Sequence, residues 1–399
     1  MVVKLCLNMI VKNEEHVIER CLLNVRHLID AVAIVDTGSS DKTISIINDF
    51  MKKENLPGEV ISQPWVHFHI NRTQAIRHAE SFLEKIGGII KIDRPMTAQE
   101  WSEKHQANTD TWYLLFMDAD NTLKSEKVEP YKFNKEKLTA DNYIIDMTQS
   151  IIKYPYSWLI KIDKLGVKRW KWASIIHEYV CPDGDWKPTV GKLTGGYIIS
   201  GREGSRNKDP LKYLKDALIL EQGLLDEPNN ERYVFYLAQS YRDNVKHKLA
   251  IKYYIKRAEM GGWFEERYIS YLEAGRLTLM CNPTKVAKAL QYFIRAIDVN
   301  PKRLEAPYYL VRTARLNKLF MVGWLWGKIF IDLPKPGDSL FVDQDIHDWK
   351  FYDETAVCAF YANDKPACKM LSEKALIHES RMDPGDRDRI KQNIKFCSM

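Results

Sequence analysis

The chain has 399 residues, 45% of them hydrophobic and 28% charged, which is a composition that excludes a disordered protein. At about 150 residues per domain, this length predicts two or three domains. The formal net charge of +6, from 59 basic and 53 acidic residues, is too small to indicate a nucleic-acid partner.

The cysteines and the apolar segments indicate in which cellular compartment the protein is expected. The seven cysteines are widely spaced and include no Cys-x-x-Cys pair, so neither a disulfide framework nor a zinc site is expected. The N-terminus becomes polar at Lys12, too soon for a secretory signal, and no run of 18 apolar residues predicts a membrane-spanning helix. We therefore expect a cytoplasmic protein, without an integral membrane segment, in a reducing compartment.

The first half of the chain alternates apolar, strand-like segments with segments of helical periodicity. The expected strands are 4–11, 31–35, 59–61 and 112–117, and the expected helices are 14–28, a helix from Lys42 onward, and 71–85. This alternation predicts a mostly parallel sheet with helices on both faces. Residues 87–110 read as an insertion, and residues 138–200 as further strands and long loops.

Polar clusters follow three of the expected strands. The first begins at Lys12 and includes Asn13 and Glu14. The second begins at Asp36, and the third begins at Asp118 and includes Asp120. The carboxyl ends of parallel strands meet at one edge of a sheet, where ligands bind in such folds. Three clusters at that edge predict a ligand site.

Asp118-Ala119-Asp120 places two carboxylates, one small residue apart, directly after an apolar strand. Carboxylate oxygens suit Mg²⁺ and Mn²⁺, and such a cation can bridge the phosphates of a nucleotide. It would neutralise the charge that develops on a leaving nucleoside diphosphate. Asp-x-Asp also occurs in helix caps and turns, but its place beside two other polar strand ends favours a metal-and-nucleotide motif.

After Pro210 the pattern becomes helical, with small and aromatic residues at the spacing of tetratricopeptide repeats. Ala289, Phe293, Ala296 and Pro301 fit the second half of one repeat. Small residues let paired helices approach closely, and a generic helical bundle is the alternative. We expect an α/β domain over residues 1–205 and an all-α, repeat-like domain over residues 206–399.

Two later segments add to this expectation. The most apolar window, 319–333, is expected to be a buried helix, and residues 356–362 and 369–377 are expected to form one more helical pair. With these segments, the helical pattern extends close to the C-terminus.

The stretches 7–14, 34–43 and 116–120 resemble the successive motifs of family 2 glycosyltransferases. That family has the GT-A fold, a Rossmann-like α/β domain, and it typically inverts the anomeric centre. A family 2 domain followed by tetratricopeptide-like helices resembles a bacterial and viral subgroup, some of whose members glycosylate peptides or proteins. The stretch 233–241 and the Gly-Gly-Trp turn at 261–263 are similar to that subgroup.

The resemblance implies roles for individual residues. Asp36 is similar to the acid that contacts a pyrimidine base, with Asn13 or Glu14 nearby, and Arg72 to an arginine that approaches the nucleotide. Asp118 would face the ribose and the metal, and Asp120, beyond Ala119, would bind the metal.

A second pair of functional side chains, His177 and Glu178, follows a tryptophan-containing strand. A neutral imidazole suits Mn²⁺, so His177 is a candidate metal ligand. An inverting transfer needs a carboxylate that takes the proton of the acceptor hydroxyl, and Glu178 is the candidate base. The family more usually has a Glu-Asp pair here, and Asp183 and Asp185 are rival bases.

The segment 201–208 is glycine-rich and basic. Its Arg202 and Arg206 are candidate contacts for the diphosphate, because arginine forks onto phosphate oxygens. A solvated linker is the alternative interpretation.

The leading hypothesis is a metal-dependent, inverting glycosyltransferase with Mn²⁺ or Mg²⁺, a UDP-sugar donor, and a glycan, peptide or protein as acceptor. A sugar nucleotidyltransferase is disfavoured because residues 8–13 contain no glycine for a phosphate loop. A repeat-type interaction protein with a catalytically weak N-terminal domain is disfavoured by the intact Asp118 and Asp120. The helical domain can present a concave surface to a peptide, form a homodimer or shield the catalytic domain.

Overall fold

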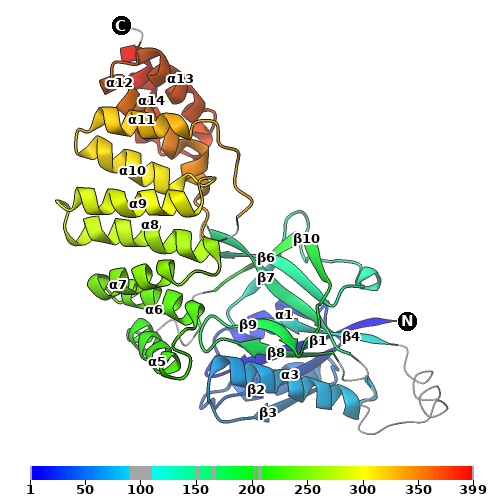
Figure 1. The fold of residues 1–399 in the computed structure, drawn as a ribbon. Coiled ribbons are helices and arrows are strands. Elements are labelled where there is room, and N and C mark those ends of the chain that lie inside the picture. Colours follow the sequence, from blue (N-terminus) through cyan, green and yellow to red (C-terminus); the bar gives the residue numbers. More distant parts are fainter. Residues whose placement is uncertain are drawn as a thin grey trace. The chain divides into compact units, whose positions relative to one another are not determined.

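A computed structural model describes residues 2–89, 110–149, 152–163, 168–201, 203–204, 209–338 and 340–397 (Figure 1). The chain divides into two compact units, Met1–Lys212 and Tyr213–Met399, and each is described by itself. Among the described residues, no helix combines the length and the hydropathy needed to cross a membrane.

The N-terminal unit is built on an eight-stranded sheet. In spatial order its strands are β3 (Gly58–Ser62), β2 (Ala31–Asp36), β1 (Val3–Val11), β4 (Thr111–Phe116), β7 (Ile152–Lys161), β6 (Asn142–Gln149), β10 (Val190–Ile199) and β5 (Thr122–Ser125). The first four strands are parallel, so their carboxyl ends share one edge. A separate hairpin pairs β8 (Arg169–Ala173) with β9 (Tyr179–Asp183).

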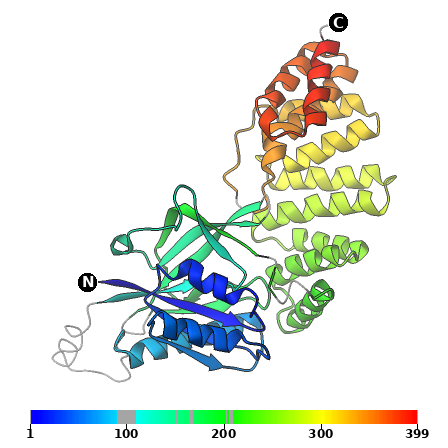
Figure 2. The same cartoon turned by 180° about the vertical axis from the view of Figure 1, so that it is seen from behind.

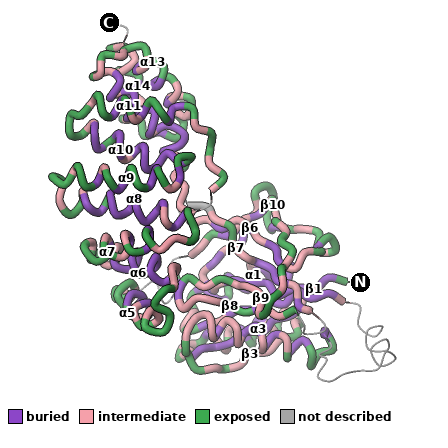
Figure 3. The backbone as a smooth tube through the Cα atoms, in the orientation of Figure 1, coloured by how far each residue is buried: buried purple, intermediate pink, exposed green. Residues whose placement is uncertain are grey.

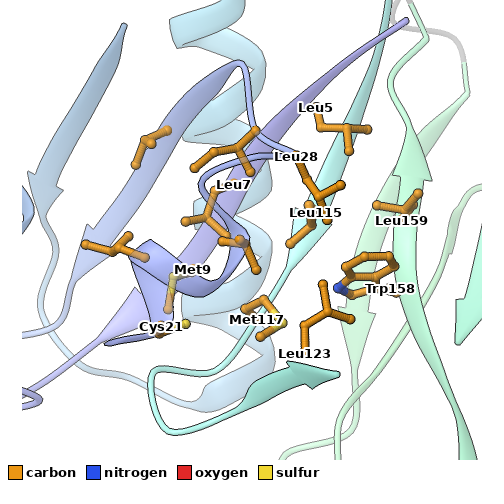
Figure 4. Close-up of a cluster of buried hydrophobic side chains, with 14 of the residues drawn as sticks. Leu5, Leu7, Met9, Cys21, Leu28, Leu115, Met117, Leu123, Trp158 and Leu159 are labelled. Carbon is orange, nitrogen blue, oxygen red and sulfur yellow. The ribbon is translucent and has the colours of Figure 1, made fainter. Parts of the chain in front are cut away.

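Helices cover both faces of this sheet, because side chains of a strand alternate between its faces. Leu5, Leu7 and Met9 of β1 join a core with α1 (Ile18–Val25) and α2 (Thr43–Lys53), part of which is drawn in Figure 4. Cys6 of the same strand joins a second core with α3 (Phe68–Lys85) and β8. A short 3-10 helix, Lys135–Lys137, lies in the connection before β6.

Asn8 shows how β1 is tied to its neighbours. This side chain is 2% exposed, and its amide donates to the carbonyl oxygens of Ala33 (3.0 Å) and Ala75 (2.8 Å). A buried amide is stable only when its hydrogen bonds are made. The two bonds join β1 to β2 and to α3, and so help to hold these three elements together.

The C-terminal unit is all helical. Its helices are α5 (Lys212–Asp226), α6 (Glu231–Asp243), α7 (His247–Glu259), α8 (Phe264–Cys281), α9 (Val286–Val299), α10 (Glu305–Leu316), α11 (Phe320–Ile329), α12 (Phe351–Tyr361), α13 (Lys365–Leu376) and α14 (Pro384–Cys397). A π-helical turn, Ile346–Lys350, precedes α12, and a 3-10 turn, Glu379–Arg381, precedes α14. From α6 to α14, each helix packs on the helix that follows it in the chain (Figures 1 and 2).

The expected fold class, an α/β domain followed by an all-α domain of paired helices, is confirmed. The small and aromatic residues at the expected repeat positions are buried between helices: Ala289, Phe293 and Ala296 of α9 are fully buried. The Cβ that an alanine would add at Gly275 of α8 would lie 2.4 Å from the ring of Phe293, so these two helices approach closely. The pair expected at 356–362 and 369–377 corresponds to α12 and α13, and α14 extends it.

One expectation is wrong. The window 319–333 does not form a buried helix, because α11 ends at Ile329 and exposes Met321 (54%) and Leu325 (56%). Only Gly323, Trp324 and Gly327 are buried within it, so the helix packs along a narrow stripe. Figure 3 shows that the central strands of the sheet are buried along their length, whereas many helices are buried on one side only.

Two element boundaries also differ from expectation. The first helix begins at Ile18 rather than Glu14, because residues 14–17 form a turn. The third begins at Phe68 rather than Asn71. Most of the insertion expected at 87–110 lies outside the described residues.

Candidate functional site

The loops after β1 and β2 are joined by hydrogen bonds. The Asn13 N–H donates to Ser39 Oγ (2.9 Å), and the Ser40 N–H donates back to Asn13 Oδ1 (2.8 Å). The Glu14 N–H donates to Thr43 Oγ1 (2.8 Å). The structure therefore brings the predicted residues Asn13 and Glu14 to the loop that follows Asp36.

Asp36 is almost fully buried, with 2% of its surface exposed. Its carboxylate accepts hydrogen bonds from the N–H groups of Gly38 (3.0 Å) and Ser39 (3.0 Å). Gly38 has a φ of 106°, a conformation that glycine adopts without steric cost. Asp36 thus shapes its own loop, and its contact with a nucleobase stays a prediction.

Arg72, from the second turn of α3, joins two of the predicted acids. Its Nη2 lies 2.5 Å from Asp118 Oδ1 and its Nε donates to Glu178 Oε1 at 2.8 Å. The guanidinium lies 4.9 Å from the ring centre of Trp172, and only 11% of the Arg72 side chain is exposed. Burial alone would lower the pKa of Arg72, but Asp118 and Glu178 outweigh it and raise this pKa above its ordinary range.

Two tyrosines of β7 adjoin this ion pair. Burial, followed by the charge of Asp118, raises the pKa of both Tyr156 and Tyr154, so both hydroxyls stay protonated at neutral pH. The Tyr156 hydroxyl is buried and has no hydrogen-bond partner among the residues that the structure describes. Neither residue was a predicted site residue; the signal was Tyr-x-Tyr in a strand, which places both rings on one face.

Asp120 is held by the backbone of the chain after β10. The Gly204 N–H donates to Asp120 Oδ2 at 2.9 Å. A Cβ at Gly201 would lie 2.1 Å from the Asp120 carbonyl oxygen, so this close approach requires glycine. Arg20, which was not a predicted site residue, lies 2.7 Å from Glu203 and donates to the same carbonyl oxygen at 3.3 Å.

Arg202 and Arg206, the predicted diphosphate contacts, lie outside the described residues. Residues 203 and 204, between them, are described and lie beside Asp120. These two residues, together with Gly201, are the part of the segment that is shown to lie next to the predicted metal motif.

The donor set of Asp118 and Asp120 suits a small divalent cation. Each carboxylate uses one oxygen in the contacts above and has a second oxygen. Mg²⁺ is commonly held by one or two carboxylates together with substrate phosphates and water. Within the described ranges, no group of three or more His, Cys, Asp or Glu side chains converges as a metal site, and His177 is exposed with a φ of 55°.

The three candidate bases have different surroundings. Glu178 contacts Arg72 and thereby adjoins Asp118. Asp183 lies in ion pairs with Arg77 (2.8 Å) and Lys171 (3.4 Å), and Asp185 is exposed. Of the three, Glu178 is the acid that the structure joins to the cluster at the strand ends.

Comparison with known families identifies the first part of this unit. Residues 6–81 match the family model described as glycosyl transferase family 2. This segment contains Asn13, Asp36 and Arg72. The chain therefore contains a segment that matches this family, which supports glycosyl transfer as a general class of reaction. No curated protein matches the chain in a sequence comparison.

Solved structures with helical repeats are similar to part of the chain. A tetratricopeptide repeat protein of Thermus thermophilus is 14% identical, with a TM-score of 0.31 over 46% of this chain and 91% of that one. A second, from Parabacteroides merdae, is 12% identical, with a TM-score of 0.34 over 46% of this chain and 68% of that one. The repeat protein YrrB is 13% identical, with a TM-score of 0.34 over 45% of this chain and 84% of that one.

Proposed function

We propose that this protein is a metal-dependent, inverting glycosyltransferase that moves a sugar from a UDP-sugar to a glycan, peptide or protein acceptor. The observation that carries the proposal is the ion pair in which Arg72 joins Asp118 to Glu178, at the carboxyl ends of the parallel strands. Arg72 lies inside the family 2 segment. One side chain thus connects the predicted nucleotide-binding acid to the predicted base.

The donor would bind at the strand ends. Asp118 and Asp120 would hold Mg²⁺ or Mn²⁺, which when bound neutralises charge on the diphosphate leaving group. Asp36, Asn13 and Glu14 would surround the nucleoside, and Arg72 adds a fixed positive charge beside Asp118. Because Arg72 is 11% exposed and held at two points, its charge is preorganised.

Glu178 would act as the general base. An inverting displacement needs a carboxylate that accepts the proton of the acceptor oxygen as that oxygen attacks the anomeric carbon. The hydrogen bond from Arg72 fixes one oxygen of Glu178, and the other can face the acceptor.

The acceptor is assigned only by class. Paired helices in the C-terminal unit would offer a surface for a peptide or protein acceptor, as helical repeats generally do. A homodimer through the same helices is the other use we propose for that unit.

Release of UDP from a panel of UDP-sugars, with and without Mn²⁺, tests the proposal. We expect metal-dependent release for at least one donor, and its loss in Asp120→Ala. Asp298→Ala, which changes an exposed aspartate of the helical unit, is the matched control and should retain activity. If no donor gives metal-dependent release, the proposal is wrong and the interaction-protein alternative is favoured. Pyrophosphate release from UTP and a sugar phosphate would instead indicate a nucleotidyltransferase.

A further inference from the structure

A tryptophan is exposed on the loop between β3 and α3. Trp65 is 40% exposed and its neighbour Val66 is 43% exposed. Burying a large apolar side chain is favourable, so an exposed one forgoes that gain in free energy. An exposed tryptophan near a candidate site is therefore a reason to look for a ligand that covers it.

The loop that carries Trp65 is firmly held. Asn71 is fully buried, and its side chain accepts from the Val66 N–H (2.9 Å) and donates to the Pro64 carbonyl (3.0 Å). The ring of Phe68 meets the Trp65 ring edge to face, with 4.6 Å between centroids. These contacts fix the backbone on both sides of Trp65 and support its ring, so the indole is presented in a defined place.

That place is beside the predicted nucleoside site. In the pairing of β2 with β3, Ser62 lies opposite Asp36, and the Gln63 N–H donates to the Asp36 carbonyl oxygen at 2.9 Å. Trp65 follows two residues after Gln63. On its other side, α3 leads within two turns from Phe68 to Arg72. The Trp65 loop therefore runs from the residue that adjoins Asp36 to the helix that carries Arg72.

We propose that the indole of Trp65 stacks on the nucleobase of the donor nucleotide. This inference rests on the proposed function. Both oxygens of Asp36 already accept hydrogen bonds from Gly38 and Ser39, so this acid cannot supply the whole affinity for a base. A planar aromatic ring supplies the rest, because every nucleobase has a π face. Trp65 would then set affinity, and Asp36 would set the choice of base.

The test is the binding of UDP, with Mg²⁺, to the full-length protein by isothermal titration calorimetry. Stacking on an aromatic ring contributes about 1–3 kcal/mol per base, so Trp65→Ala should weaken UDP binding by about fivefold or more. Trp65→Phe keeps a planar ring and should bind UDP within a few-fold of the unchanged protein. Trp263→Ala is the control, because Trp263 has a similar exposure, 42%, but lies in the helical unit.

A second ligand separates stacking from a general disturbance of the site. Ribose 5-diphosphate has no base, so Trp65→Ala should bind it as the unchanged protein does. Equal loss for both ligands, or no loss for UDP, would overturn the stacking role while leaving the proposed function intact. If the unchanged protein bound neither UDP nor any other nucleoside diphosphate, both the stacking role and the proposed function would fail. A Trp65→Ala protein that raises only the KM for an acceptor would assign the indole to the acceptor instead.

Discussion

Glu178 is the residue whose chemistry is most directly testable. Glu178→Gln keeps the size of the side chain and an oxygen for Arg72, but it removes the basic carboxylate. We expect UDP binding to stay within a few-fold and the rate of sugar transfer to fall by about 10²–10⁴-fold, the usual contribution of a general base. Calorimetry with UDP and a steady-state transfer assay measure the two effects separately.

Asp183→Asn is the comparison for that experiment. Asp183 is the rival base, but it is held by Arg77 and Lys171, so its loss should leave transfer largely unchanged. A large loss in Asp183→Asn together with a normal rate in Glu178→Gln would reassign the base.

Arg72 should also stabilise the fold. Its side chain is 11% exposed, and Arg72→Ala would leave Glu178, itself 13% exposed, without its partner. Removing one partner of a largely buried ion pair is costly, and we expect the free energy of unfolding to fall by about 2 kcal/mol or more. Arg72→Lys should restore only part of this, because one ammonium cannot reproduce the two-point fork. Urea denaturation at neutral pH provides the measurement.

Arg77 offers a matched control on the same helix. It pairs with Glu80 and Asp183, but 26% of its side chain is exposed. Pairs of this kind contribute about 0–1 kcal/mol, so Arg77→Ala should cost less than Arg72→Ala. Equal losses for the two variants would show that the Arg72 bridge has no special structural role.

Sequence patterns located the candidate site better than they described its contacts. Asp36, Asp118 and Asn13 could be placed because each follows an apolar strand, and parallel strands end at one edge. Tyr156 and Arg20 could not be assigned to the site. Tyr-x-Tyr indicates that two rings share one face of a strand but not what that face contacts, and Arg20 reaches Asp120 from a distant part of the sequence. Local periodicity carries no information about such contacts.

At the scale of elements, close helix packing gives a prediction at Gly275. Alanine is normally favoured over glycine in a helix by about 1 kcal/mol. Here its Cβ would lie 2.4 Å from the fully buried ring of Phe293, so Gly275→Ala should instead destabilise the protein by about 1–3 kcal/mol. Thermal or urea unfolding reports the sign directly.

Gly385 of α14 is the comparison, because no described atom outside its own helix turn lies within 4 Å of the Cβ that alanine would add. Gly385→Ala should be neutral or slightly stabilising. A stabilising Gly275→Ala would mean that α8 and α9 can separate to admit a methyl group, contrary to the packing described.

A second element-scale prediction concerns Glu305, at the start of α10. Glu305 and the fully buried Arg303 form an ion pair at 2.7 Å, and Arg303 also donates to the carbonyl oxygens of Leu340 and Phe341. Burial opposes ionisation of Glu305, but His347 and Arg303 outweigh it and lower the pKa of Glu305 to about 2. The ionised carboxylate therefore favours the folded state by about 3 kcal/mol at neutral pH.

This stabilisation has a defined pH dependence. It is complete above about pH 4.5, the pKa of the unfolded chain, and is lost as the pH falls toward 2. Glu305→Gln should thus be much less stable than the unchanged protein at pH 7, and the difference should shrink between pH 4.5 and 2. Glu259→Gln, at an ion pair whose carboxylate is 56% exposed, is the control and should change the stability at pH 7 by at most about 1 kcal/mol. A difference that is constant with pH would contradict the role of the charge.

The elements themselves were largely predictable, because β2 and β4 are continuous apolar runs and helix α9 has a clear apolar period. The exceptions have a physical reason. Window 319–333 is the most apolar of the chain, which favours a buried helix, yet α11 buries only a stripe around Trp324. Hydropathy alone does not say which apolar face finds a neighbour.

At the scale of the whole molecule, each compact unit has its own buried residues, and this predicts two separable unfolding transitions. Scanning calorimetry of the full-length protein should resolve them. Glu305→Gln should lower the transition of the helical unit, residues 213–399. UDP with Mn²⁺ should raise the other, because a ligand that binds only the folded state stabilises it by about 2.7 kcal/mol at 100 times its Kd. A single transition that both changes shift together would instead show that the two units unfold as one cooperative body.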